Sequence, residues 1–177
     1  MPASYRVLFV CTGNTCRSVL ATHVLRRELA DAVLTAEVDS AGLRVRAPGQ
    51  PADPRAQEIL LRKGYPAEHQ TRQFEPALLT SYDLVIGLDS MHVSVLRHVA
   101  PDRDTAARIR LLGSFDPAAG AGWDVPDPVG GGETDYERAL ALVRSAVPGV
   151  VAAVRAGGQK SQVSATTLTG GAGQMCR

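Results

Sequence analysis

Short hydrophobic runs and longer amphipathic segments alternate four times along the chain. The first and third runs are almost continuously apolar, which is typical of β-strands buried on both faces of a sheet. In the longer segments, hydrophobic residues recur every three or four positions, which predicts helices with one buried side. The strand-like runs cover residues 5–10, 34–38, 83–88 and 109–115, and the helical segments cover residues 18–31, 54–63, 90–100 and 134 onward.

This alternation predicts an α/β fold built from right-handed βαβ units on a parallel sheet. In such sheets, ligands bind at the carboxyl ends of the strands, near the point where the strand order reverses. The loop that follows the first strand, residues 11–18, is therefore a strong candidate for a binding site.

The last part of the chain changes character. Thr134 and Glu137 match a capping box that opens the last helix, and Pro148-Gly149 is expected to kink or interrupt it. Residues 157–177 contain five Gly, five Ser or Thr, and no aromatic or acidic residue. They bury too little apolar surface to offset their ordering entropy, which predicts a flexible tail after a single domain over residues 1–156.

Composition and charge narrow the function classes. The net charge of +1 gives no broad attraction to nucleic acid or membrane lipid, and no apolar run approaches the roughly 20 residues that span a bilayer. Three cysteines are a poor disulfide framework and no signal peptide is visible, so we expect a cytoplasmic protein. We expect no metal or other cofactor, since no metal-ligand spacing links the cysteines to His23, His69, His92 or His98.

The turn from Cys11 to Ser18 carries the candidate chemistry. A strand-to-helix turn directs backbone N–H groups and the positive end of a helix dipole to one point, which makes a cradle for an anion. Gly13 and Asn14 tolerate the left-handed backbone of a tight loop, and Arg17 can hold two oxygens of a phosphate. The positive field favours the thiolate form of Cys11, which is then poised for in-line attack on phosphorus.

Taken singly, these residues have ordinary interpretations. Cys11 is then a small buried residue at a strand end, and Arg17 is a solvated residue in a first helical turn. The combination Cys-x5-Arg-Ser, placed between a buried strand and an amphipathic helix, favours the functional interpretation.

The residues VLFVCTGNTCRS resemble the phosphate-binding loop of the low-molecular-weight protein tyrosine phosphatase family, whose pattern is Val-Cys-x-Gly-Asn-x-Cys-Arg-Ser. The likeness covers residues 5–156 and continues through DSAG (39–42), ADPRA (52–56), YDLVIGLD (82–89) and DVPDPVGGGETDYERA (124–139). It implies a phosphatase domain with a three-layer αβα sandwich, in which helices flank a four-stranded parallel sheet and the phosphate-binding loop follows the first strand.

The resemblance also implies residue roles. Cys11 is the nucleophile that forms a phosphocysteine intermediate, and Arg17 binds the phosphoryl oxygens. Asn14 and Ser18 brace the loop, and the serine hydroxyl hydrogen-bonds the thiolate. Cys16 is either a loop packing residue or the partner in a reversible disulfide that protects Cys11 from over-oxidation. The phosphate-binding residues are Thr12, Gly13, Asn14, Thr15, Cys16, Arg17 and Ser18.

Asp127 is the candidate general acid, which protonates the leaving group and then activates water. It lies in a Gly/Pro-rich loop at the same end of the sheet as Cys11, and prolines on both sides restrict its backbone. The alternative, an aspartate that hydrogen-bonds its own turn, is the better description of Asp116 and Asp124. Asp89 resembles a family position near the phosphate loop, and an N-cap role explains it equally well.

Three positions bear on specificity. Val129 and Arg46 stand where many tyrosine-specific members place aromatic walls, and Thr15 stands where those members commonly have an aliphatic residue. The threonine and the glycine-rich loop after Asp127 also resemble bacterial protein arginine phosphatases of the same superfamily. The loop of residues 44–50 borders the substrate or is simply solvated.

Three hypotheses follow. The first is a phosphatase acting on phosphotyrosine in proteins or on small aryl phosphates, with phosphoarginine as the alternative substrate and a tyrosine kinase among the candidate partners. The second is a thioredoxin-coupled arsenate reductase. Such an enzyme needs further cysteines to relay oxidation, and Cys176 is the only cysteine outside the loop, which weakens this hypothesis. The third is a non-catalytic phosphate-binding module, which would not need Cys11 and Asp127 together.

Overall fold

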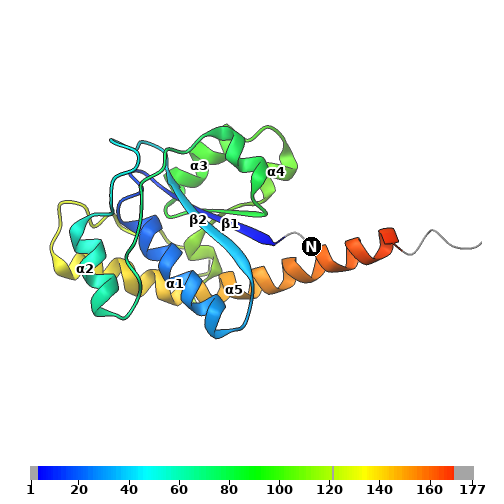
Figure 1. The fold of residues 1–177 in the computed structure, drawn as a ribbon. Coiled ribbons are helices and arrows are strands. Elements are labelled where there is room, and N and C mark those ends of the chain that lie inside the picture. Colours follow the sequence, from blue (N-terminus) through cyan, green and yellow to red (C-terminus); the bar gives the residue numbers. More distant parts are fainter. Residues whose placement is uncertain (1–3, 121, 170–177) are drawn as a thin grey trace, which may run out of the picture.

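The structure, a computed structural model, describes residues 4–120 and 122–169, with side chains up to residue 158. Four strands and five helices follow one another with two short 3-10 helices, η1 and η2 (Figure 1). The strands are β1 (Tyr5–Cys11), β2 (Ala36–Gly42), β3 (Leu84–Gly87) and β4 (Ile109–Leu111). The helices are α1 (Arg17–Asp31), α2 (Pro54–Arg62), η1 (Pro76–Ser81), α3 (Ser90–His98), α4 (Arg103–Ala107), η2 (Leu112–Phe115) and α5 (Glu133–Thr169).

All strand pairs in the sheet are parallel, in the order β2-β1-β3-β4. The chain leaves β1 for the edge strand β2 and then crosses over β1 to reach β3. The strand order therefore reverses beside β1, and a loop at the carboxyl end of β1 lies at the position where parallel α/β sheets bind ligands.

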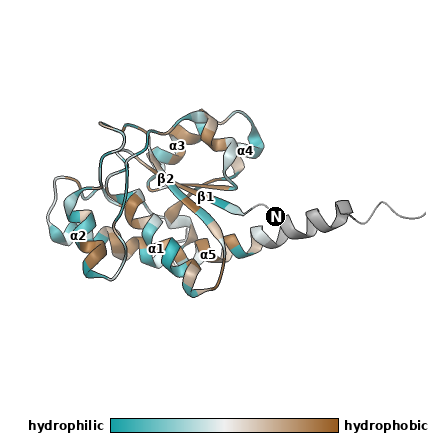
Figure 2. Ribbon diagram, viewed as in Figure 1, coloured by the Kyte–Doolittle hydropathy of each residue, from teal (hydrophilic) through white to brown (hydrophobic). Residues whose placement is uncertain are grey.

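Side chains of β1 alternate between two cores, one on each face of the sheet. Val7 and Phe9 face the larger core, which α1, α2 and α5 complete, whereas Leu8 and Val10 face a smaller core against α3 and η1. In Figure 2, hydrophobic segments lie on the sheet and on helix surfaces that face it. The predicted three-layer αβα sandwich with a four-stranded parallel sheet is thus confirmed.

The predicted fourth strand was too long. Only Ile109–Leu111 forms β4, and the next four residues form the 3-10 helix η2. Ser114 accounts for part of this change, because its hydroxyl donates to the carbonyl of Leu111 at 2.7 Å and so favours a local turn over a sheet ladder. The short helix α4, capped by Asp102, was not predicted.

The predicted capping box of α5 and its predicted interruption at Pro148 were both wrong. The helix begins at Glu133, where the N–H of Gly132 donates to the Asp135 carboxylate, whereas Glu137 pairs with Arg62 instead of completing a capping box. The helix also continues through Pro148.

The residue after this proline has a packing role. A Cβ at Gly149 would overlap the carbonyl oxygen of Phe115, so the glycine allows α5 to approach η2 closely. The helix thus packs closely against η2 next to the proline, which lacks one hydrogen-bond donor.

The segment predicted to be a flexible tail is partly helical, since α5 extends to Thr169 (Figure 1). Residues 170–177, including Cys176, lie outside the described residues. By length and composition alone, Glu133–Gly158 could cross a membrane. The sequence did not indicate this, because the apolar residues of this segment do not form one continuous run. Core helices of soluble proteins pass the same test, and Leu140, Val143 and Val147 of this segment are buried in the larger core.

Candidate active site

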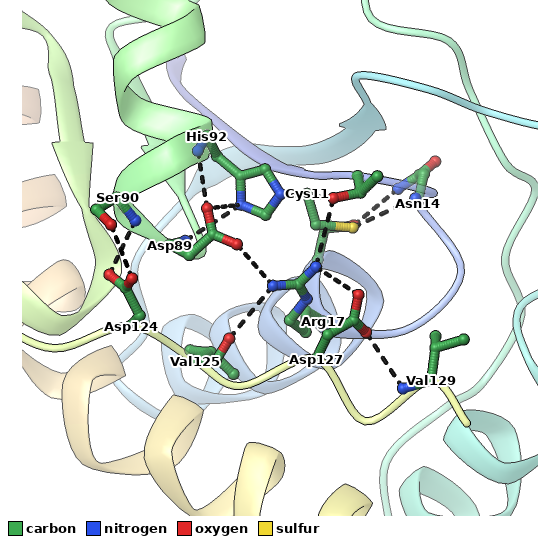
Figure 3. Close-up of polar contacts among 12 residues, drawn as sticks. Cys11, Asn14, Arg17, Asp89, Ser90, His92, Asp124, Val125, Asp127 and Val129 are labelled. Atoms are coloured by element: carbon green, nitrogen blue, oxygen red, sulfur yellow. Dashed lines mark hydrogen bonds and ion pairs between the residues drawn. The ribbon is translucent and has the colours of Figure 1, made fainter. Parts of the chain in front are cut away.

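The loop between β1 and α1 is folded around the thiol of Cys11, which is 2% exposed (Figure 3). The backbone N–H of Asn14 lies 3.3 Å from Cys11 Sγ and donates to it. The Ser18 hydroxyl lies 3.1 Å from the same sulfur. These donors suit a sulfur that carries negative charge, and they confirm the predicted contact between Ser18 and Cys11.

Asn14 is the brace of this loop. Its backbone is left-handed, with φ of 56°, and its side chain is fully buried. The Nδ2 group donates to the hydroxyls of Ser18 and Ser40, both at 2.9 Å, and Oδ1 accepts the N–H of Arg72 at 2.8 Å. His69 Nε2 donates to the Asn14 carbonyl at 2.8 Å. The left-handed turn is thus held by β2 and by the segment before η1.

The N-terminus of α1 is open to an anion. Cys16 is the N-cap, and among the described residues no side chain accepts a capping hydrogen bond there and no acidic residue lies in the first turn. The first N–H groups of a helix and the helix dipole favour a negative ligand. This end of α1 therefore has the electrostatics of a phosphate site.

The guanidinium of Arg17 is held between two carboxylates from distant loops. Nη1 donates to Asp89 Oδ2 at 2.8 Å and to the carbonyl of Val125 at 3.3 Å, and Nη2 donates to Asp127 Oδ2 at 2.8 Å (Figure 3). Because Arg17 is only 5% exposed, these contacts determine its position in the cleft. The buried Arg17 contradicts the interpretation of a solvated helical residue.

Asp89 combines the two roles that the sequence left open. It caps α3 by accepting the N–H of His92 at 2.8 Å, and it pairs with Arg17. Burial lowers the pKa of His92 to about 4, so the imidazole is neutral at pH 7. Its Nδ1 lies 2.9 Å from Asp89 Oδ1 and 3.2 Å from the backbone nitrogen of Asp89, and its Nε2 shares a 2.9 Å hydrogen bond with the Thr12 hydroxyl. His92 thereby connects α3 to the phosphate-binding loop.

Asp127 lines the same cleft as Cys11, at the same end of the sheet, as predicted. One carboxylate oxygen pairs with Arg17, while the other accepts the N–H of Val129 at 3.2 Å and so closes a turn. Its side chain is 47% exposed, which leaves it accessible to a substrate. Asp116 forms the predicted turn bond with Ala118.

The turn description was wrong for Asp124. Its carboxylate accepts from the N–H and the hydroxyl of Ser90, both at 2.8 Å. This contact joins the loop that carries Asp127 to the first turn of α3.

Contacts with α2 hold the other end of the Asp127 loop. Arg55 donates to the carbonyl of Gly131 at 2.8 Å, pairs with Asp53 and lies over the ring of Tyr136. The Tyr136 hydroxyl lies 3.5 Å from Cys16 Sγ. Burial raises the pKa of the Cys16 thiol to about 11, so Cys16 is protonated at neutral pH. Cys11 and Cys16 are both free, and the protective disulfide remains a prediction.

A cleft of about 560 Å³ opens above Cys11. The three predicted specificity residues, Thr15, Arg46 and Val129, all line it together with Cys11, Arg17 and Asp127. The loop of residues 44–50 contributes Arg44, Val45, Arg46, Ala47 and Gln50. This loop therefore borders the cleft, as one of the two interpretations of the sequence expected.

Sequence reasoning missed the histidines of the site. His92 was assigned no role, although its position three residues after Asp89 matches a capping box. His69 had no comparable signal, because it reaches Asn14 across 55 residues. Within the part of the chain that the structure describes, no group of three His, Cys, Asp or Glu residues is placed to hold a metal ion.

Comparisons with known proteins agree with the phosphatase site that the geometry indicates. The family "Low molecular weight phosphotyrosine protein phosphatase" matches residues 6–160. A low molecular weight protein-tyrosine-phosphatase of Streptomyces coelicolor is 46% identical over 86% of this chain and 94% of its own length. The low molecular weight phosphotyrosine protein phosphatase of Homo sapiens is 34% identical over 76% of this chain and 86% of its own.

Solved structures of phosphatases have the same fold as this chain. A protein tyrosine phosphatase from Entamoeba histolytica superposes with a TM-score of 0.82 and 27% identity, covering 87% of this chain and 99% of the other. The YwlE arginine phosphatase gives a TM-score of 0.77 and 25% identity, covering 85% and 95%. With the family pattern present from the phosphate-binding loop through the aspartate loop, the chain belongs to the low-molecular-weight protein tyrosine phosphatase family.

Proposed function

We propose that this enzyme hydrolyses phosphotyrosine in proteins, and small aryl phosphates, through a phosphocysteine intermediate. The observation that carries the proposal is the joint placement of Cys11, Arg17 and Asp127 on one cleft, with Arg17 in contact with the carboxylate of Asp127. A nucleophile, a binding guanidinium and an acid are the three groups that this reaction needs.

In the first step, the Cys11 thiolate attacks phosphorus and forms an S–P bond. The bond between phosphorus and the phenolic oxygen breaks, and the protonated carboxyl group of Asp127 donates its proton to that oxygen. Arg17 and the loop N–H groups bind the equatorial oxygens, where charge accumulates. Asp89 keeps Arg17 oriented while phosphoryl oxygens replace Asp127 as its partners.

In the second step, the Asp127 carboxylate takes a proton from water as the water oxygen bonds to phosphorus. The S–P bond breaks, which releases phosphate and regenerates the thiolate. The donors from Asn14 and Ser18 stabilise the sulfur as a leaving group. One carboxyl group thus serves as acid and then as base.

Phosphoarginine is the second candidate substrate. Thr15 lines the cleft beside Cys11, and Val129 and the following glycines stand where an aromatic wall would hold a tyrosine ring. Similarity to the YwlE arginine phosphatase adds support. The curated relatives at 41–46% identity are named as tyrosine phosphatases, which favours phosphotyrosine.

We place the enzyme in the cytoplasm, where reducing conditions would keep Cys11 and Cys16 free. Its partners there would be tyrosine-phosphorylated proteins, and a tyrosine kinase is one candidate. The domain boundary at residue 156 is also a proposal.

Turnover of phosphotyrosine, phosphoserine and phosphoarginine substrates, measured side by side at one pH, tests the proposal. We expect phosphotyrosine to be hydrolysed fastest. Cys11→Ser should abolish turnover but retain phosphate binding, because a serine hydroxyl remains protonated in this loop. Cys16→Ser is the matched control, since it should keep most of the activity while making inactivation by peroxide harder to reverse. Normal turnover by Cys11→Ser would rule out the mechanism.

A further inference from the structure

A second hollow of about 450 Å³ lies beside the catalytic cleft, between the loop that follows β2 and helix α3. Its lining is almost entirely apolar and consists of Leu43, Phe74, Pro76, Met91, Val95 and Val99, together with Thr12 and Arg44. We refer to these residues as the α3 groove. Figure 2 shows hydrophobic segments on α3 above the sheet.

The α3 groove exposes hydrophobic side chains on the surface. Met91 is 49% exposed and Val95 is 38% exposed, and they lie one helical turn apart on α3. The neighbouring residues Val93 and Leu96 of α3 belong to the smaller core, and His92 is also buried. Met91 and Val95 are not members of that core, and they line a hollow whose other walls are mostly apolar. A contiguous apolar surface of this kind can mark a binding site.

The α3 groove adjoins the catalytic cleft. Thr12 and Arg44 line both hollows. Thr12 follows Cys11 directly and is tied to α3 by His92. A chain whose phosphorylated residue reaches Cys11 can therefore pass Thr12 and Arg44 and enter the α3 groove without leaving the surface.

The charges beside the two hollows indicate what kind of polypeptide could bind there. Arg44 and Arg46 border the cleft, and neither forms an ion pair with any described residue. No acidic residue lines the α3 groove among the described side chains. A bound polypeptide with an acidic residue beside the arginines and an apolar residue in the α3 groove would complement both the positive charge and the apolar lining.

We propose that the α3 groove binds an apolar side chain of the substrate protein, a few residues away in sequence from the phosphorylated residue. This inference rests on the proposed function, because it requires a phosphorylated polypeptide in the cleft. It names the substrate class more closely: phosphoproteins with an acidic residue and then a large apolar residue beside the phosphorylation site.

A peptide series tests the inference. Each phosphotyrosine peptide carries leucine, alanine or lysine at one position within about four residues of the phosphotyrosine, since an extended chain spans about 3.3–3.6 Å per residue. At one or two positions, leucine should raise kcat/KM about tenfold over alanine, which equals about 1.4 kcal/mol. p-Nitrophenyl phosphate, which cannot reach the α3 groove, serves as the internal reference.

Val95→Glu and Ser94→Glu form a matched pair of variants. Both positions are exposed neighbours on α3, but only Val95 lines the α3 groove. Val95→Glu should remove the preference for leucine and create a preference for lysine at the same peptide position, while Ser94→Glu should change neither. Both variants should hydrolyse p-nitrophenyl phosphate at the wild-type rate, which shows that they are folded.

The outcomes separate the two proposals. Absence of a leucine preference in the wild type, or equal effects of the two variants, would overturn the α3 groove as a docking site. A dimer that Val95→Glu dissociates in analytical ultracentrifugation, with unchanged peptide kinetics, would also overturn it, because a second copy would then be the occupant. Failure of the wild type on every phosphotyrosine peptide would instead overturn the proposed function, and the same variants with phosphoarginine peptides would then decide the role of the α3 groove.

Discussion

Replacing Asn14 with alanine would test how the phosphate-binding loop is held. The change removes three buried side-chain hydrogen bonds, with Ser18, Ser40 and the N–H of Arg72. At about 1 kcal/mol each, they contribute about 3 kcal/mol to the free energy of unfolding. Alanine also tolerates the left-handed backbone of this position less well than asparagine, at a cost of about 1 kcal/mol. The expected loss of about 4 kcal/mol is a large part of the stability of a typical domain.

Urea unfolding at pH 7, followed by circular dichroism, measures this loss as a shift in the midpoint at constant slope. Asn14→Gly isolates the hydrogen bonds, because glycine adopts the left-handed conformation freely, and it should lose about 3 kcal/mol. Val33→Gly is the matched control. Val33 has a similar φ of 54° but is 91% exposed, so glycine should stabilise the protein there by about 1 kcal/mol. A loss below about 1 kcal/mol for Asn14→Ala would refute the role of Asn14 as a brace.

Asp127→Asn should lower kcat by roughly 10²–10⁴-fold for substrates with poor leaving groups, and by less for activated aryl phosphates. An equal loss of kcat across a series of leaving groups would argue that Asp127 only positions its loop. If phosphoarginine is the native substrate, Thr15→Ile should lower the turnover of phosphoarginine and leave the turnover of phosphotyrosine unchanged. If phosphotyrosine is the native substrate, Val129→Tyr should lower the KM for phosphotyrosine by rebuilding a wall of the cleft. Kinetics of each variant on both substrates distinguish these two cases. Stability should fall as the pH is lowered from about 6.5 to 4, because burial lowers the pKa of both His23 and His92 to about 4 and only the unfolded chain binds those protons in this range. Each histidine contributes up to about 3 kcal/mol, and urea midpoints that do not change between pH 7 and pH 4.5 would contradict this.

Local patterns were sufficient to predict most of the fold. β3 and most of β1 are buried on both faces and so are almost continuously apolar, and α2 is marked by the cap at Asp53 and by Pro54. The errors did not share one cause: a local turn at Ser114 shortens β4, and α5 runs on through a proline. Pro148 disfavours a helix locally, but α5 continues through it and packs closely against η2 at Gly149.

The sequence by itself determined the fold class and which chemical groups gather at one edge of the sheet. Parallel strands bring their carboxyl ends to the same edge, so a loop after β1 that contains Cys11 and Arg17 must lie near the loop that carries Asp127. Both facts follow from residues that are neighbours in the sequence or from the regular spacing of hydrophobic residues, and both can be read from the sequence alone.

Only the tertiary structure decided how those groups are oriented. Arg17 is fixed by Asp89 and Asp127, which are 72 and 110 residues away, and Asn14 is held by Ser40 and by His69. Hydrogen bonds depend on distances of about 3 Å and on direction, and no local pattern specifies these between segments so far apart in the chain. The same holds for the α3 groove, whose walls come from four separate segments that meet only when the sheet is assembled.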